Sequence, residues 1–153
     1  MIWTATGTLT AEAATRHPEL VSPAVVSGLA QLDPAVAATV GVAEIDAALA
    51  DTAAFCERYG VAPEASANCV VVKGKRGGDV RFAACMVLAT TRADVNGVVR
   101  RRLAVRSGSF APMVEAGALT RMEYGGITPI GLPGDWPIPV DAAVAAAPEV
   151  VIG

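Results

Sequence analysis

A chain of 153 residues that is 53% hydrophobic and 18% charged can bury a core of its own, which excludes a disordered protein. The sequence contains no apolar run of about 18 residues and no basic start followed by an apolar block, so it predicts neither a membrane-spanning helix nor a signal peptide. A net charge of −3 does not by itself favour a nucleic-acid ligand.

The first 45 residues are expected to form an N-terminal segment that packs on the rest of the chain. Ser22-Pro23 combines an N-cap residue with proline at the first helical position, so it predicts a helix start. Asp33-Pro34 repeats the same signal for a short second helix. Residues 38–45 are expected to form a strand.

The next elements are a helix and a β-hairpin. The helix begins at Asp46 or Asp51 and ends near Tyr59, where Gly60 has the place of a C-terminal cap. Two apolar strands then follow, at residues 68–73 and 80–90, and their separation by Arg-Gly-Gly-Asp predicts a tight hairpin turn.

Another helix is predicted from the capping box that begins at Thr91, ending at about residue 105. Its expected apolar stripe comprises Val95, Val98, Val99 and Leu103, and we interpret Asp94 as a helix cap rather than a site residue.

The last part of the chain is expected to contain a short helix at residues 110–119, a glycine- and proline-rich stretch, a brief strand ending at Asp141, a helical turn and a last strand at residues 149–152. This order does not give regular βαβ alternation. It fits a single α/β (α+β) domain in which helices flank a mixed, partly barrel-like sheet.

The sequence lacks the residues and motifs that several common kinds of site require. Cys56, Cys69 and Cys85 have no CxxC spacing, so we expect reduced thiols in a cytoplasmic protein, without a disulfide framework or a zinc site. The one histidine, His17, lies in a region with no other site signal, and we interpret it as structural. HExxH, Walker and GxGxxG motifs are absent, so the sequence predicts no metal and no cofactor.

Positive charge is concentrated in residues 73–106. This segment has nine of the twelve Lys and Arg residues and two acidic residues, a net charge of +7, whereas the rest of the chain carries −10. Such a segment can face the phosphates of a nucleic acid, or it can be a solvated surface that acids elsewhere balance. Composition alone favours the solvated surface.

Four pieces of sequence, in this order and spacing, resemble the YbaK/ProX-type aminoacyl-tRNA editing domains, which also occur as insertions in bacterial prolyl-tRNA synthetases. They are RYGV at residues 58–61, the hairpin at 68–91, ADVN at 93–96 and GGITPIGLP at 125–133. The last contains the family's GxxxP loop, from Gly125 to Pro129, and Pro139-Val140-Asp141 then matches a family strand that ends in Asp. The resemblance places the editing domain at 46–153.

The resemblance implies hydrolysis of the ester between a wrong amino acid and the 3′ end of tRNA, with alanyl, cysteinyl, seryl or threonyl esters as family substrates. It implies that the GxxxP loop, Gly125, Gly126, Ile127, Thr128 and Pro129, binds the aminoacyl end and that Asp141 orients the ribose or the amino group. Asp141 is equally well interpreted as a helix cap.

Glycine lets backbone N–H groups approach a carbonyl oxygen that becomes an oxyanion, and proline limits the entropy lost on binding. A positioned water or a ribose hydroxyl can then transfer the proton, so no catalytic histidine is required. A tRNA partner also gives Arg100, Arg101 and Arg102 a reason to face phosphates.

The chain departs from the family at Asn68, which lies where active relatives carry a lysine at the start of the first hairpin strand. Asparagine can hydrogen-bond a carbonyl but supplies no cation. Lys75 is expected at the hairpin turn, facing solvent. A second departure is the C-terminal end, because the family continues with a glycine-rich turn and further strand. We expect either that the sequence ends before the domain does or that this version lacks part of the pocket wall.

Three functions stay open. The chain is an aminoacyl-tRNA deacylase acting in trans with Asn68 as the candidate catalytic residue, a catalytically impaired module that binds tRNA, a nucleotide or a synthetase, or a hydrolase of another small ester or amide. None of them needs a membrane.

Overall fold

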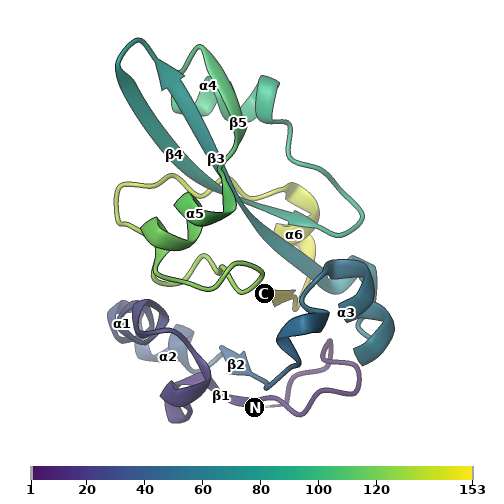
Figure 1. Cartoon of the computed structure of the whole chain (residues 1–153). Helices are drawn as coiled ribbons and strands as arrows, with labels where there is room; N and C mark the ends of the chain where they lie inside the picture. The colour runs from purple at the N-terminus through teal and green to yellow at the C-terminus, as the bar shows by residue number, and fades with distance from the viewer. Residues whose placement is uncertain (1, 153) are drawn as a thin grey trace.

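The computed structural model describes residues 2–152, and short elements make up its N-terminal part (Figure 1). Strands β1 (Glu12–Ala13) and β2 (Gly41–Val42) pair antiparallel. Between them lie α1 (Pro23–Gln31) and α2 (Pro34–Ala37), with 3-10 turns at Ala14–Arg16, Pro18–Leu20 and, after β2, Ala47–Leu49.

Both predicted helix starts in this part are confirmed. The Ser22 hydroxyl accepts from the N–H of Val25 at 3.4 Å, and the Asp33 carboxylate accepts from that of Ala35 at 2.8 Å. These bonds satisfy backbone donors that the first turn of a helix leaves without partners.

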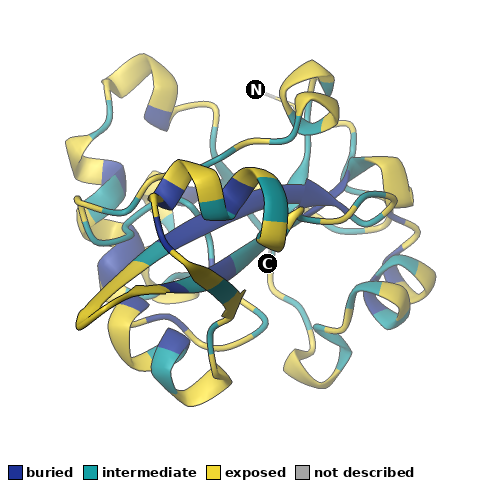
Figure 2. Ribbon diagram, turned by 90° about the horizontal axis from the view of Figure 1, so that it is seen from above, coloured by how far each residue is buried: buried dark blue, intermediate teal, exposed yellow. Residues whose placement is uncertain are grey.

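The rest of the chain is built on one long antiparallel hairpin, β3 (Ser66–Arg76) with β4 (Asp79–Leu88). Its turn lies between Arg76 and Asp79, as the sequence predicts. The second half of β4 is buried throughout, because other elements cover both of its faces (Figure 2). The other elements are α3 (Thr52–Tyr59), a 3-10 turn (Pro63–Ala65), a π-helical turn (Val95–Val99), α4 (Arg100–Leu103), β5 (Ser107–Phe110), α5 (Met113–Thr120), α6 (Ala142–Ala146) and β6 (Val151–Ile152).

Two short strands share one edge of β3. The antiparallel β5 pairs with Val72–Lys75, and the parallel β6 pairs with Ser66 and Ala67. Asn68–Val70 therefore has no strand neighbour on that edge among the described residues. The sheet is thus mixed and open, and it has a gap in its middle.

The opposite edge of the sheet is covered by the chain just before α6. The N–H groups of Ala84 and Met86 donate to Pro137 and Pro139, and the N–H of Asp141 donates to Met86. Residues 137–141 thus run parallel to β4 as an irregular fifth strand, which agrees with the predicted brief strand ending at Asp141.

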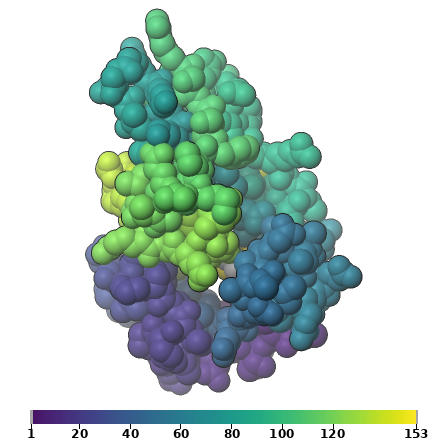
Figure 3. Space-filling model, viewed as in Figure 1, coloured from purple at the N-terminus to yellow at the C-terminus, as the bar shows by residue number. Residues whose placement is uncertain are grey.

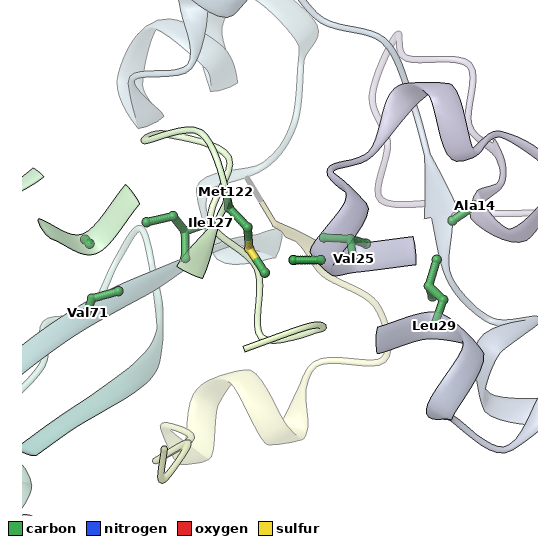
Figure 4. Close-up of a cluster of buried hydrophobic side chains, with 8 residues drawn as sticks. Ala14, Val25, Leu29, Val71, Met122 and Ile127 are labelled. Carbon is green, nitrogen blue, oxygen red and sulfur yellow. The ribbon is translucent and has the colours of Figure 1, made fainter. Parts of the chain in front are cut away.

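A core cluster joins the N-terminal part to the hairpin. Val25 and Leu29 of α1 belong to the same buried cluster as Met122 and Ile127 from the loop after α5, and Val71 of β3 (Figure 4). Each fully buried side chain of this size contributes roughly 1.5–3 kcal/mol to folding. The loop after α5 therefore lies between two packed layers.

The prediction of one helix from Thr91 to residue 105 is wrong in detail. The Asp94 carboxylate accepts from the N–H groups of Gly97 and Val98, at 2.9 and 3.2 Å, and so begins the π-helical turn. The Thr91 hydroxyl instead hydrogen-bonds the backbone of Leu88. Asp94 is therefore a cap, as interpreted, while Thr91 is not.

The π-helical turn also changes which side chains are buried. It has more residues per turn than an α-helix, so it shifts the periodicity on which the apolar stripe depended. Val99 and Leu103 are buried, but Val98 is 45% exposed.

The strand β5 was not predicted, because Ser-Gly-Ser-Phe has almost no apolar pattern and becomes a strand only by pairing with β3. The predicted helix at 110–119 begins three residues later, at Met113, because Phe110 belongs to β5. Within residues 2–152, no helix is both long and apolar enough to cross a membrane.

Candidate functional site

A cavity of about 310 Å³ opens at the gap in the edge of β3. It brings together the start of α3, the first half of β3, the end of β5, α5 and the first part of the GxxxP loop. Its lining residues are Ala50, Asp51, Thr52, Asn68, Cys69, Val70, Val71, Phe110, Ala111, Ala116, Tyr124, Gly125 and Ile127.

Asn68 lies in this cavity, oriented by its neighbour on α3. The Thr52 hydroxyl donates to Asn68 Oδ1 at 3.1 Å. The amide nitrogen of Asn68 makes no hydrogen bond to another described residue, so both of its protons can donate to a ligand. Thr52 thus turns a neutral side chain into an aimed hydrogen-bond donor.

The GxxxP loop presents alternate residues to the cavity. Gly125 and Ile127 line it, and neither backbone N–H donates to an acceptor in the described part of the chain. Gly126 and Thr128 use theirs internally, on Glu123 O at 2.8 Å and Met122 Sδ at 3.3 Å. Two of the five loop residues therefore line the cavity with Asn68 and have backbone N–H groups without an acceptor among the described residues.

The remaining loop residues face the other way. Gly126, Thr128 and Pro129 line two cavities, of about 480 and 620 Å³, between the loop and the N-terminal part. Figure 3 shows a hollow on this face where the purple N-terminal part, the blue region around α3 and the yellow-green loop meet. The Thr128 hydroxyl donates to Ile130 O at 3.0 Å, so its proton is already used within the loop.

Glycine is required at two positions of the loop. Gly125 has φ +92°, and a Cβ there would lie 3.1 Å from the Cβ of Ala50 across the cavity mouth. Gly131 has φ +90° and packs against the backbone of Ala24 in α1, where a side chain would collide. Left-handed backbone of this kind favours glycine, and here it lets the loop turn tightly against α1.

The acidic residue that lines the cavity is Asp51, not Asp141. The Asp141 carboxylate accepts from the N–H of Ala143 at 3.0 Å and caps α6, beside the far edge of the sheet. Asp51 is at the start of α3, and its carboxylate makes no capping hydrogen bond. Sequence spacing alone identifies Asp51 as a helix start, which is why it was not proposed for the site.

Neither Lys73 nor Lys75 lines the cavity, so neither takes the place of the lysine expected at position 68. Lys73 Nζ lies 2.9 Å from Glu115 Oε1, and Lys75 is exposed near the hairpin turn, as predicted. No Lys or Arg is among the described residues that line the cavity. Among the described residues that line the cavity, Asp51 is therefore the one with a formally charged side chain.

Cys69 also lines the cavity, but its thiol is poorly reactive. Burial raises the pKa of Cys69 to about 12 and that of Cys85 to about 11. Because the thiolate is the nucleophilic form, a buried thiol with such a pKa stays protonated at neutral pH.

The predicted arginines lie at the far end of the hairpin from the cavity, in and around α4. Arg81 donates to Leu103 O at 2.8 Å, and the N–H of Arg106 donates to Lys75 O at 2.9 Å, which fixes α4 beside the hairpin turn. We call the resulting cluster the basic tip: Lys75, Arg76, Arg81, Arg100, Arg101, Arg102 and Arg106. An acidic neighbour, Asp79, lies 4.0 Å from Arg81.

His17 lies in the N-terminal part and pairs with two carboxylates. Its ring nitrogens contact Glu12 and Glu19, the latter at 2.8 Å, and the hydrogen bond to Glu19 raises the pKa of the imidazole. His17 does not line the cavity with Asn68. Among residues 2–152, no group of three His, Cys, Asp or Glu side chains could hold a metal ion.

The chain is thus a mixed α/β domain with a cavity at a break in its sheet. The family model of the aminoacyl-tRNA editing domain matches residues 46–153, so the chain belongs to that family. The resemblance seen in the sequence is thereby confirmed. Comparison with curated proteins gives no match.

Solved structures share the fold at low identity. A candidate trans-editing enzyme for prolyl tRNA synthetase superposes with a TM-score of 0.65 at 22% identity, covering 85% of this chain and 79% of that one. A scaffold protein from computational epitope grafting gives 0.65 at 20% identity, with 87% and 81% covered. The hypothetical protein APE2540 gives 0.59 at 19% identity, and the match spans 68% of this chain and 66% of that protein.

Proposed function

We propose that this protein is a free-standing aminoacyl-tRNA deacylase, which hydrolyses the ester of a mischarged tRNA in trans. The observation that carries the proposal is the cavity lined by Asn68, Gly125 and Ile127, whose side-chain amide nitrogen (Asn68) and backbone N–H groups (Gly125, Ile127) have no acceptor among the described residues. Membership of the editing-domain family supplies the substrate class.

The proposed reaction begins with the ester carbonyl held among these donors. The Asn68 amide and the N–H groups of Gly125 and Ile127 donate to the carbonyl oxygen, and they stabilise the negative charge that develops when water attacks. Hydrolysis adds water across the ester and releases the free amino acid and the ribose hydroxyl. The attacking water passes its proton to bulk water or to a ribose hydroxyl of the substrate.

Asp51 takes the role that the sequence resemblance gave to Asp141. An aminoacyl ester carries a free α-ammonium group close to its carbonyl, and the Asp51 carboxylate lies at the same cavity. We assign to it the ammonium group, because opposite charges attract and no other charged side chain among the described residues lines the cavity.

The basic tip would bind the tRNA body. Residues Val71, at the cavity, and Lys75, at the tip, are four apart on β3, which corresponds to about 13 Å along an extended strand. Arg100, Arg101 and Arg102 extend this positive surface on α4, and clustered arginines bind phosphates.

One observation favours a second candidate function. No Lys or Arg is among the described residues that line the cavity, and Asn68 is expected where active relatives carry a lysine, so the chain would bind the aminoacyl end without hydrolysing it. In this alternative the protein is a tRNA- or nucleotide-binding module, or associates with a synthetase.

The deciding experiment is a deacylation assay. The protein, in excess, is incubated with tRNAs charged with Ala, Ser, Thr and Cys, and loss of the ester is followed against buffer. We expect at least one ester to be hydrolysed, and removing the Asn68 donor by Asn68→Ala to slow that turnover about 100-fold or more. Thr52→Val, which releases the amide of Asn68, should slow it less.

Asn96→Ala is the matched control, because Asn96 is an exposed asparagine on the π-helical turn outside the cavity. Its variant should hydrolyse at the wild-type rate. If no charged tRNA is hydrolysed but tRNA still binds, the deacylase is rejected and the binding module is retained. Increased turnover in Asn68→Lys would support the assignment of position 68 to the family lysine.

A further inference from the structure

Two exposed aromatic rings flank the mouth of the cavity. Of the seven aromatic residues of the chain, Phe110 and Tyr124 are the ones with more than half of their surface exposed, 63% and 56%. Both line the cavity that contains Asn68. Neither ring packs on another aromatic ring among residues 2–152, whereas Phe55 packs with Tyr59 and Phe82 stacks on Trp136.

The backbone explains how the two rings come to the same place. Phe110 is the last residue of β5, opposite Val72 of β3, so it stands where β5 ends and the gap begins. Tyr124 immediately precedes Gly125, and the left-handed φ of Gly125 turns the loop towards the cavity. In the sequence, Phe110 therefore lies shortly before α5 and Tyr124 shortly after it.

The fold itself gives no reason for these rings to be exposed. Burying an aromatic side chain of this size is favourable, and the other five aromatic residues are buried or partly buried. Exposed rings at a cavity mouth indicate that a flat, apolar surface of a ligand covers them when the ligand binds. Nucleobases offer such a face, and they stack on Phe and Tyr whatever their sequence.

We propose that Phe110 and Tyr124 form a stacking site for the nucleobase next to the ester. This inference rests on the proposed function. The aminoacyl group enters the cavity as far as Asn68, and the base attached to the same ribose then lies at the mouth of the cavity. The two aromatic residues then select esters of nucleosides over other small esters.

The experiment compares a substrate that has a base with one that has none. Kinetic constants are measured with the charged tRNA that wild type hydrolyses fastest and with the ethyl ester of the same amino acid. Phe110→Ala and Tyr124→Ala should each raise KM for the charged tRNA about 5- to 150-fold, the range for loss of one stacked base, and leave KM for the ethyl ester unchanged. Phe110→Trp, which keeps an aromatic ring, should have a KM for the charged tRNA close to that of wild type.

Val114→Ala serves as the control, because Val114 is 86% exposed on α5 and does not line the cavity. If Phe110→Ala and Tyr124→Ala raise KM equally for the charged tRNA and the ethyl ester, the rings only shape the cavity. If they change KM for neither substrate, the rings do not contact the substrate. Both results overturn the stacking site but leave the deacylase intact.

A direct binding measurement covers the case in which wild type hydrolyses nothing. The probe is 3′-alanylamino-3′-deoxyadenosine, whose amide bond replaces the ester. Wild type should bind it more tightly than it binds alanine amide, and Phe110→Ala and Tyr124→Ala should remove that difference. Equal binding of the two probes by wild type would reject the stacking site independently of catalysis.

Discussion

At the residue scale, Asn68 is the neutral side chain that we expect at the position of a lysine in active relatives. A lysine ammonium would bring charge to a carbonyl oxygen, whereas Asn68 brings a dipole whose direction Thr52 sets at 3.1 Å. The loss of charge is not compensated by Lys73, which is paired with Glu115. Our proposal assigns the backbone N–H groups of Gly125 and Ile127, which have no acceptor among the described residues, to the same carbonyl oxygen.

A carboxylate at the cavity predicts selectivity for a free amino group. Asp51→Asn should raise KM for a charged tRNA about 2- to 5-fold, because Asp51 is exposed and an exposed ion pair is worth up to roughly 1 kcal/mol. The same substitution should not affect hydrolysis of the N-acetylated aminoacyl-tRNA, which has no ammonium group. Equal loss on both substrates would contradict the assignment of Asp51.

His17 predicts a pH dependence of stability that is separate from the cavity. Its hydrogen bond to Glu19 raises the pKa of the imidazole above 6.5 in the folded state. The protonated imidazole therefore stabilises the fold fully below about pH 6.5, and this contribution is lost as the pH rises through the raised pKa.

The measurement is the melting temperature of wild type and His17→Gln at about pH 6 and about pH 8.5. Wild type should exceed the variant by more at the lower pH. A difference that stays constant, or grows with pH, would exclude an ion pair of His17 in the folded protein.

Among the elements, the loop after α5 depends on a helix outside the matched family region. Gly131 lies against the backbone of Ala24, and Gly28 of α1 lies against Gly131 in return. Ile127, 6% exposed, packs in the same cluster as Val25. The N-terminal part thus supports the far side of the loop whose near side carries the donors.

This packing predicts a local cost for any side chain at Gly131. Gly131→Ala should lower the free energy of unfolding by about 1–3 kcal/mol, since its φ is +90° and a Cβ would collide with α1. Gly134→Ala, in the same loop with open space around it, should change stability by less than about 0.5 kcal/mol. Chemical denaturation measures both free energies of unfolding. If Gly131→Ala and Gly134→Ala lower stability equally, the packing of Gly131 against α1 does not contribute to stability.

Over the whole molecule, the cavity and the basic tip are at different ends of one hairpin. The cavity is at the start of β3, and the basic tip is at its end, so an RNA substrate would have to reach along the strand (Figure 1). The acidic remainder of the chain would repel phosphates elsewhere and so favour one orientation.

This separation predicts that binding and hydrolysis can be varied independently. Replacing Arg100, Arg101 and Arg102 with Ala should weaken tRNA binding and make it less dependent on salt, by about one unit of log–log slope for each phosphate that the variant no longer neutralises. Hydrolysis of an amino acid ethyl ester should stay unchanged. Arg16→Ala, an exposed arginine of the N-terminal part, is the control, and an unchanged salt slope in the triple variant would exclude the tip from tRNA binding.

The sequence by itself determined the hairpin, its turn, the helix starts at Ser22 and Asp33, and the family, because caps, turns and alternating apolar residues are local signals. It could not predict β5, whose four residues form a strand only through β3, or the π-helical turn that exposes Val98.

The site divides in the same way. Asn68 and the glycines of the loop could be proposed from motif and order, whereas Asp51, Thr52, Phe110 and Tyr124 reach the cavity through the packing of segments distant in sequence. Only the tertiary structure decided which loop N–H groups are free and which carboxylate lines the cavity. Both depend on how α1, α3 and β3 pack around the break between β5 and β6, which no local pattern encodes.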